Sequence, residues 1–260
     1  MLIKEKDKYI PSLINLWHKV FGDEREYIEL FFKKAYFDSE CFAEIVDGEA
    51  VSALYLLKCI IKCGGKIYHG RYLYAAATLT EHRGRGLMSK LIKEAQDYAQ
   101  NENLDFIALV PADDGLYGYY SGFDFIEAMY KYKLAIDNDT STMRACREIA
   151  DGEEFCKIRS SADCDMLIYD DICNRYAFEC MTFSGTRVFY LNDNSYYAEG
   201  EELLCCDEES AMNLINNLSG ESVVYTNCPL KKAEKIRNGL IYYLNDEIKN
   251  KEIYMNIALD

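Results

Sequence analysis

A short turn that alternates arginine and glycine carries the clearest chemical signal in the sequence: Arg83-Gly84-Arg85-Gly86. Apolar residues recur after it at helical spacing, so the turn stands at the N-terminus of a predicted helix over residues 87–101. The first amides of a helix have no intrahelical acceptor, and the helix dipole adds partial positive charge there. Such a terminus favours a phosphate or pyrophosphate, with Arg83 and Arg85 as countercharge. The competing interpretation is a packing turn with solvated arginines.

The element that must position this turn is the stretch before it. Tyr72–Leu79 is an apolar, aromatic run with small alanines in its middle, which predicts a buried strand. The turn lacks the G-x-x-x-x-G-K-[ST] order of a P-loop and the G-x-G-x-x-G order of a Rossmann fingerprint. Two common nucleotide-binding classes are therefore excluded.

The turn resembles motif A of the GNAT acyltransferases, R/Q-x-x-G-x-G/A, except that Met88 stands where the family usually has Gly or Ala. In that family the backbone amides of the turn bind the pyrophosphate of acetyl-CoA, and the preceding strand pairs with the pantetheine arm. The resemblance therefore implies acetyl-CoA as acyl donor. The Met88 side chain would limit how closely this coenzyme can approach the turn. The cofactor-binding positions that it implies are Thr78, Leu79, Thr80, Arg83, Gly84, Arg85, Gly86, Leu87 and Met88.

The same resemblance gives a meaning to Leu104–Val110, a short apolar run of strand length that Pro111 ends. In the GNAT fold this strand lies parallel to Tyr72–Leu79, and the crossover brings both carboxyl ends near the helix N-terminus. A ligand seated on the turn would then run into the gap between the two strand ends.

A second stretch, residues 116–125, resembles the GNAT segment L-[FY]-x-x-Y-x-x-x-G-F. The ungapped match places Tyr120 at the family's tyrosine and Asp124 at its usual glycine, while Gly122 falls two positions early. In the family this tyrosine is the general acid that protonates the departing thiolate, a role that suits a phenol of pKa near 10. Tyr117 is the alternative candidate for the general acid, because the displaced Gly122 allows a second alignment of the segment with the family pattern. Packing is the competing role, since the chain has 22 tyrosines.

Composition indicates a folded, acidic protein. Half of the residues are apolar and 13% are aromatic, which excludes a disordered chain. A net charge of −15 disfavours nucleic acid and anionic membranes as partners. It agrees with a cationic or amine-bearing acceptor, although solubility alone also accounts for it.

The cysteines and the N-terminus bear on the compartment. There are 11 cysteines without a C-x-x-C pair, and none of the 3 histidines stands at ligand spacing to one of them. We therefore predict free thiols, no metal and a cytoplasmic location. The N-terminus lacks the apolar core of a signal peptide, and no apolar stretch is long enough to span a membrane.

Periodicity also predicts the remaining elements of the first half. We expect two amphipathic helices and a strand meander, followed by another strand after the second motif, at residues 9–21, 24–36, 41–46, 50–62, 66–79 and 126–134. The polar, breaker-rich Asp137–Thr142 is the predicted linker, with the domain boundary near residues 136–150.

The second half has no chemical motif of its own. A helix is predicted over 161–178, and a hairpin joins Arg187–Leu191 to Ser195–Cys206 through Asn192–Asn194. A further helix and two strands follow, marked by Ala211, Leu214, Ile215 and Leu218 and by the runs 222–226 and 253–259. This order is similar to the second, cofactor-free half of the Eis (enhanced intracellular survival) group. In that group the second half covers the acceptor site. The chain-terminal carboxylate of that group serves as general base, a role that is not transferred to Asp260.

The sequence thus predicts an α/β (α+β) fold, with a GNAT domain over 1–140 and a smaller GNAT-like half over 150–260. The GNAT domain would have a mixed twisted sheet with helices on both faces. The chain is too short for the third domain of the Eis group.

The expected activity is N-acetyl transfer, in which a small-molecule or peptide amine attacks acetyl-CoA directly. Backbone amides at the end of the strand before the turn would polarise the thioester carbonyl, with Tyr120 as acid. The base is unassigned, because Glu81 is interpreted as a solvated loop residue, and no Cys–His or Ser–His–Asp order offers a covalent route. Tyr72 and Tyr74 either line the acceptor pocket or belong to the core. Competing classes are a non-catalytic acyl-CoA sensor or scaffold and a structural protein that binds no CoA; the acceptor and oligomeric state stay open.

Overall fold

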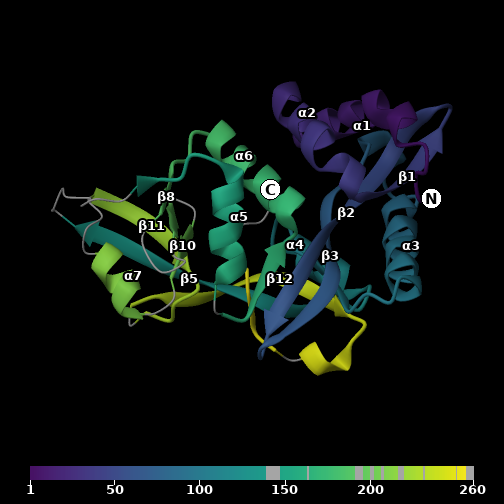
Figure 1. Cartoon of the computed structure of the whole chain (residues 1–260). Helices are drawn as coiled ribbons and strands as arrows, with labels where there is room; N and C mark the ends of the chain where they lie inside the picture. Colours follow the sequence, from purple (N-terminus) through teal and green to yellow (C-terminus); the bar gives the residue numbers. More distant parts are fainter. Residues whose placement is uncertain are drawn as a thin grey trace.

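A computed structural model of the chain describes most of its length (Figure 1). The described residues are 1–138, 147–162, 164–190, 196–199, 202–205, 208–215, 220–230, 232–249 and 251–255. Most of the predicted linker Asp137–Thr142 lies outside them, as do the predicted turn Asn192–Asn194, Leu218 and Asp260. Within the described ranges, no helix combines the length and the apolar character that crossing a membrane requires.

The first half follows the predicted order of elements closely. Its helices and strands are α1 (Lys6–Phe21), α2 (Arg25–Lys34), β1 (Glu40–Val46), β2 (Glu49–Cys63), β3 (Lys66–Thr78), α3 (Leu87–Asn101), β4 (Phe106–Leu109), α4 (Gly115–Ser121) and β5 (Ile126–Asn138). The hairpin turns fall at Asp47-Gly48 and Gly64-Gly65, and all three glycines adopt positive φ. The predicted helices and strands of this half are confirmed.

The second half departs from prediction at several places. Its elements are β6 (Arg147–Glu148), α5 (Gly152–Ser161), β7 (Met166–Tyr169), α6 (Asp171–Phe183), β8 (Val188–Tyr190), β9 (Tyr196–Ala198), β10 (Glu202–Leu204), α7 (Glu208–Ile215), β11 (Gly220–Thr226), β12 (Glu234–Tyr243) and β13 (Ile253–Tyr254). The predicted hairpin exists, because β8 and β9 pair antiparallel. The run 195–206 contains two strands rather than one, since β10 pairs back onto β9.

The predicted helix over 161–178 is confirmed only in its second part, because residues 171–178 belong to α6. In its first part a strand, β7, separates α5 from α6. Its four residues are all buried and pair with β2, so tertiary pairing decides their conformation. Asp170 then begins a new helix, because its carboxylate accepts the backbone N–H of Cys173 at 2.8 Å.

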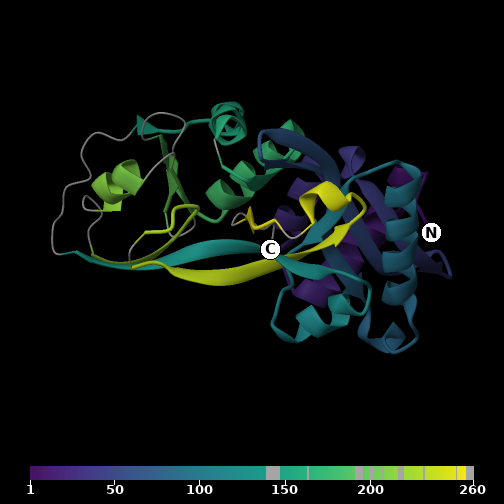
Figure 2. The ribbon, with the colours of Figure 1, turned by 90° about the horizontal axis from the view of Figure 1, so that it is seen from below.

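One strand from the second half, β12, completes the sheet of the first. It pairs antiparallel with β4 on one side and with β5 on the other, so it lies between them. Figure 2 shows β5 and β12 running side by side along the molecule. The strand pairing therefore continues through both predicted units; the division near residues 136–150 remains a prediction.

The sheet is mixed, as predicted, and both of its faces are covered. β3 and β4 are parallel, whereas β2 pairs antiparallel with β1 and β3. Alternate residues of β2 face two different cores. Tyr55 and Leu57 join the core formed with α1, α2 and α6, whereas Leu54 and Leu56 join the core under α3.

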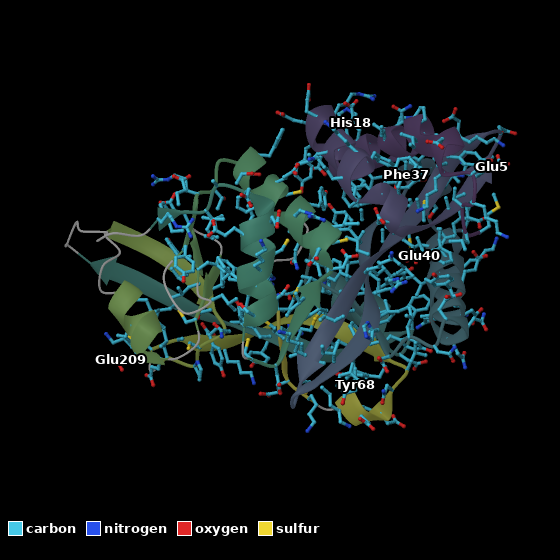
Figure 3. The ribbon with its side chains drawn as sticks, viewed as in Figure 1. Glu5, His18, Phe37, Glu40, Tyr68 and Glu209 are labelled. Carbon is cyan, nitrogen blue, oxygen red and sulfur yellow. The ribbon has the colours of Figure 1, made fainter. Side chains whose placement is uncertain are left out.

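The sheet is tied to α3 through Glu40 of β1, labelled in Figure 3. Both of its carboxylate oxygens accept from the Arg71 guanidinium of β3, at 2.8 and 3.0 Å. The hydroxyl of Tyr98 on α3 donates to the same carboxylate at 2.8 Å. A two-point arginine–carboxylate contact fixes geometry, so this group holds α3 against the strands.

The nine cysteines in the described residues are all free thiols, and eight of them are buried. Burial raises the pKa of the Cys59 thiol well above its usual range, and does the same for Cys173. Such thiols are poor nucleophiles, and they act here as small apolar residues. Cys146 and Cys206 lie outside the described part of the chain.

Candidate active site

The arginine–glycine turn joins β3 to α3, as the sequence predicts. Gly84 and Gly86 have φ values of 72° and 74°, a left-handed conformation that glycine adopts without strain. Gly86 is the N-cap residue directly before α3, and no side chain caps the helix there. No acidic residue stands in the first turn. The terminus therefore keeps its uncapped amides and its partial positive charge.

A cavity of about 650 Å³ opens at this turn. Seven of the ten predicted site residues line it: Thr78, Arg83, Gly84, Gly86, Leu87, Met88 and Tyr120. Three others, Leu79, Thr80 and Arg85, are not among the lining residues. The cavity thus brings the predicted anion-binding turn and the predicted acid to one space, although about thirty residues separate them in the chain.

The polar groups at the end of β3 mostly have partners already. The Leu79 amide donates to the Val51 carbonyl at 2.9 Å. Arg83 Nε donates to the Thr78 carbonyl at 3.1 Å, which holds this guanidinium at the cavity wall. Arg85 Nη2 instead donates to the Glu81 carbonyl at 2.9 Å and so braces the turn. Of the two arginines, Arg83 lines the cavity and Arg85 is not among the lining residues.

Tyr120 lies on α4 and is 7% exposed. Burial raises its pKa to about 12, and the neighbouring Tyr119 adds a smaller effect. The hydroxyl therefore stays protonated at any ordinary pH, as a general acid requires. Tyr117 is not among the cavity-lining residues, and its ring lies instead against Arg237.

The backbone after α4 supports the ungapped register of the second motif. Asp124 has a φ of 63°, whereas Gly122 has an ordinary φ of −65°. The left-handed conformation that a glycine would favour is thus present at position 124 and absent at 122. Aspartate is one of the few other residues that adopts it readily. The departure from the family pattern therefore places an aspartate at a position with left-handed backbone.

The structure also adds residues that the sequence did not indicate. Ala75 has a φ of 46° in the middle of β3, and the pairing with β2 shifts there, which marks a β-bulge. The next residue, Ala76, lines the cavity. Val20 and Phe21 at the end of α1 line it too. A run of alanines does not indicate a β-bulge, so this feature is found only from the backbone geometry.

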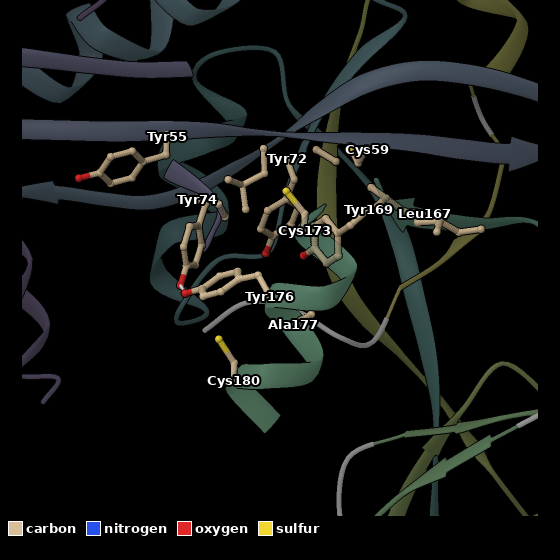
Figure 4. Packing of buried hydrophobic residues seen from close by; sticks show 14 of the residues in the cluster. Tyr55, Cys59, Tyr72, Tyr74, Leu167, Tyr169, Cys173, Tyr176, Ala177 and Cys180 are labelled. Atoms are coloured by element: carbon tan, nitrogen blue, oxygen red, sulfur yellow. Dashed lines mark hydrogen bonds between the residues drawn. The ribbon is translucent and has the colours of Figure 1, made fainter. Parts of the chain in front are cut away.

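Three further predicted candidates lie away from the cavity. Tyr72 and Tyr74 are 2% and 4% exposed and belong to the core. Figure 4 shows Tyr74 directed at Tyr176 of α6, and the two hydroxyls are 3.1 Å apart. Glu81 is exposed in a short 3-10 turn over Thr80–His82, which agrees with its interpretation as a solvated residue. Of the two alternatives, acceptor pocket or core, Tyr72 and Tyr74 therefore belong to the core.

Residues 2–126 match the family model described as Acetyltransferase (GNAT) domain. This part of the chain therefore belongs to the GNAT acetyltransferases, which confirms the resemblance of the two motifs. The matched range contains β1–β4, the arginine–glycine turn, α3 and α4. No curated protein sequence matches this chain.

Several solved structures share the fold. Eis1 from Mycobacterium abscessus is 10% identical, with a TM-score of 0.68 over 95% of this chain and 74% of its own. A GCN5-related N-acetyltransferase from Anabaena variabilis is 13% identical, with a TM-score of 0.67 over 94% and 73%. A candidate acetyltransferase from Pyrococcus horikoshii is 13% identical, with a TM-score of 0.61 over 99% and 93%. At such identities the likeness shows the fold alone, and the predicted GNAT fold is confirmed.

Proposed function

We propose that this protein is an N-acetyltransferase that moves an acetyl group from acetyl-CoA to a primary amine. The observation that carries the proposal is the cavity that the N-terminus of α3 shares with Tyr120 of α4. Uncapped amides beside two left-handed glycines suit a pyrophosphate. The end of β3, with Ala76 and Thr78 in the cavity wall, suits the pantetheine arm.

The reaction is proposed as one direct transfer. The amine nitrogen uses its lone pair to form a bond to the thioester carbonyl carbon while both reactants are held in place. A backbone N–H at the Ala75–Ala76 bulge stabilises the oxyanion. As the C–S bond breaks, Tyr120 gives its hydroxyl proton to the sulfur. The nitrogen releases one proton to solvent, and solvent returns one to Tyr120, so the cycle balances.

The substitution Tyr120→Phe tests the role of the acid. It removes the hydroxyl and keeps the ring among Tyr119 and Phe125. We expect CoA affinity to be retained and thiol release from acetyl-CoA, with a panel of amines, to fall by about 100-fold or more. Tyr117→Phe is the discriminating variant, because Tyr117 is the other candidate and lies outside the cavity lining. A large loss in Tyr117→Phe with none in Tyr120→Phe would reverse the assignment.

The second candidate function is a non-catalytic acyl-CoA-binding protein. It is favoured by Met88, because this side chain, bulkier than the usual Gly or Ala, lies in the wall of the cavity. Calorimetry with CoA and acetyl-CoA separates the possibilities. Saturable binding without turnover on any amine would support the binding protein. Absence of any heat would remove both candidates.

The acceptor is proposed to be a small-molecule or peptide amine. All lining residues that the structure describes lie between Val20 and Tyr120, so the first half builds this cavity. The exposed Phe21 at the end of α1 is one wall that an acceptor could contact. The second half contributes to the surroundings of the site through β12, which pairs with β4 and β5.

A further inference from the structure

Arg237 of β12 makes three contacts with the segment around α4. Its Nη2 lies 2.9 Å from Oδ1 of Asp114, the residue directly before α4. Its Nη1 lies 3.0 Å from Oε1 of Glu127, just after the start of β5. The guanidinium also lies 4.1 Å from the centre of the Tyr117 ring. One side chain thus bridges both ends of the segment that carries Tyr120.

α4 needs such support, because its own sequence stabilises it poorly. It has 7 residues, GLYGYYS, far fewer than an isolated helix requires. Two of them are glycines, and each costs a helix about 1 kcal/mol relative to alanine. Asp114 makes no side-chain cap, although Asp113 accepts the Gly115 amide at 2.8 Å. The placement of α4 therefore depends on contacts with the rest of the molecule.

The strand that carries Arg237 is itself held firmly. β12 lies between β4 and β5, and its Gly239 packs so closely that an added Cβ would stand 2.5 Å from the Leu109 carbonyl oxygen. Two residues of β12 pair with both neighbouring strands, Leu240 and Ile241. Arg237 thus reaches α4 from an element fixed at the point where β4 ends.

We infer that Arg237 is a positioning residue, which holds α4 so that Tyr120 keeps its place in the cavity wall. This inference rests on the proposed function, since it assigns Arg237 an effect on the acid of that reaction. An arginine suits the role because its planar fork can bond two carboxylates while its face stacks on a ring. Lysine has one ammonium group and cannot make all three contacts at once.

The matched control is Lys235, two residues earlier on the same strand. Its Nζ lies 2.5 Å from Oε2 of Glu252 and 4.4 Å from the centre of the Tyr130 ring. It therefore has the same kinds of partner, a carboxylate and a tyrosine ring, but no contact with α4. Substituting either cation by methionine keeps the apolar stem and removes the charge.

The kinetic test compares these variants in two backgrounds. We expect Arg237→Met to lower kcat about 10-fold with KM for acetyl-CoA within about 2-fold, as displacement of a catalytic group does. Lys235→Met should stay within about 2-fold of the parent, and Arg237→Lys should recover only part of the loss. In the Tyr120→Phe background Arg237→Met should cause no further loss, because the group it positions is gone. An equal loss in both backgrounds, or in Lys235→Met, would overturn the inference.

A second measurement stands apart from turnover. Amide hydrogen exchange over residues 113–121 should be faster in Arg237→Met than in the parent and unchanged in Lys235→Met. Unchanged exchange in Arg237→Met would overturn the inference, whatever the activity. Faster exchange in a protein that acetylates no amine would uphold the support of α4 and reject the proposed function instead.

Discussion

At the scale of single residues, Gly86 links backbone conformation to the proposed coenzyme site. An added Cβ at Gly86 would meet no atom within 4 Å, so Gly86→Ala acts through its φ of 74° alone. A left-handed non-glycine residue costs about 1–2 kcal/mol, and the backbone can relieve this by shifting the first amides of α3. We expect lower stability and about 10-fold weaker CoA binding, measured by urea unfolding and calorimetry.

Gly65 provides a matched control for that substitution. It also has a φ of 74° and open space around a Cβ, but it lies in the hairpin between β2 and β3, away from the cavity lining. Gly65→Ala should therefore cost a similar free energy of unfolding and leave CoA affinity unchanged. An equal loss of affinity in both variants would show that the α3 terminus has no special part in binding.

The raised pKa of Tyr120 leads to a prediction about pH. A general acid works in its protonated form, and the pKa of about 12 keeps Tyr120 protonated well beyond its usual range. Between pH 7 and about 10, kcat should therefore show no falling limb caused by Tyr120. The measurement is kcat against pH for the parent and Tyr120→Phe. A falling limb below pH 10 that disappears in Tyr120→Phe would contradict the buried, protonated acid.

At the scale of elements, the contact between β12 and β4 can be tested at Gly239. A Cβ there would stand 2.5 Å from the Leu109 carbonyl oxygen and 2.4 Å from Met129 Cε. Met129 can move, but a backbone carbonyl inside the sheet cannot, so Gly239→Ala should destabilise the protein by about 1–3 kcal/mol. Gly118→Ala is the comparison, because its Cβ would enter open space on α4 and should stabilise the helix. Urea unfolding of both variants checks the opposite signs.

The elements also show how far sequence reasoning reaches. The helices have clear polar and apolar faces and the strands are apolar runs between turns, so periodicity predicted α3 and β1–β3 to within one residue and α1 except for its first three residues. It missed β12, where charged residues and Asn238-Gly239 interrupt the pattern, and β7, whose four buried residues were taken as helix. Both strands are defined by partners far away in the chain, which a local pattern does not contain.

The features of the candidate site likewise fall into those that the local sequence indicates and those that depend on tertiary packing. The turn was predicted from residue types whose spacing has a physical reason, whereas Tyr120 was predicted from the resemblance of residues 116–125 to a GNAT segment. Both line one cavity, and their roles stay predictions. The bulge at Ala75, the end of α1 in the cavity wall and the contacts of Arg237 with α4 arise only from tertiary packing. Asp124 lies between these cases: its deviation from the motif was visible in the sequence, and only its φ explains it.

At the scale of the whole molecule, buried phenols and thiols should set the alkaline limit of stability. Burial raises the pKa of Tyr55, Tyr74 and Tyr254 well above the usual value near 10. Above pH 10 the unfolded chain releases these protons while the folded protein keeps them, so stability falls as pH rises. Buried thiols such as Cys59 act in the same direction from about pH 8.5, the usual thiol pKa.

The expected curve has two slopes. The free energy of unfolding should decline gently from about pH 8.5 and steeply above about pH 10, by about 1.4 kcal/mol per pH unit for each retained phenol proton. Urea unfolding across this range gives the curve, and tyrosinate absorbance should rise together with the loss of structure. Tyr55→Phe removes one buried phenol and should reduce the upper slope by about 1.4 kcal/mol per pH unit. Unaltered stability up to pH 11, with tyrosinate formed in the folded protein, would contradict this prediction. The buried hydroxyls would then ionise without unfolding, and the aromatic core would be far more open to water than the packing of Tyr55 and its neighbours allows.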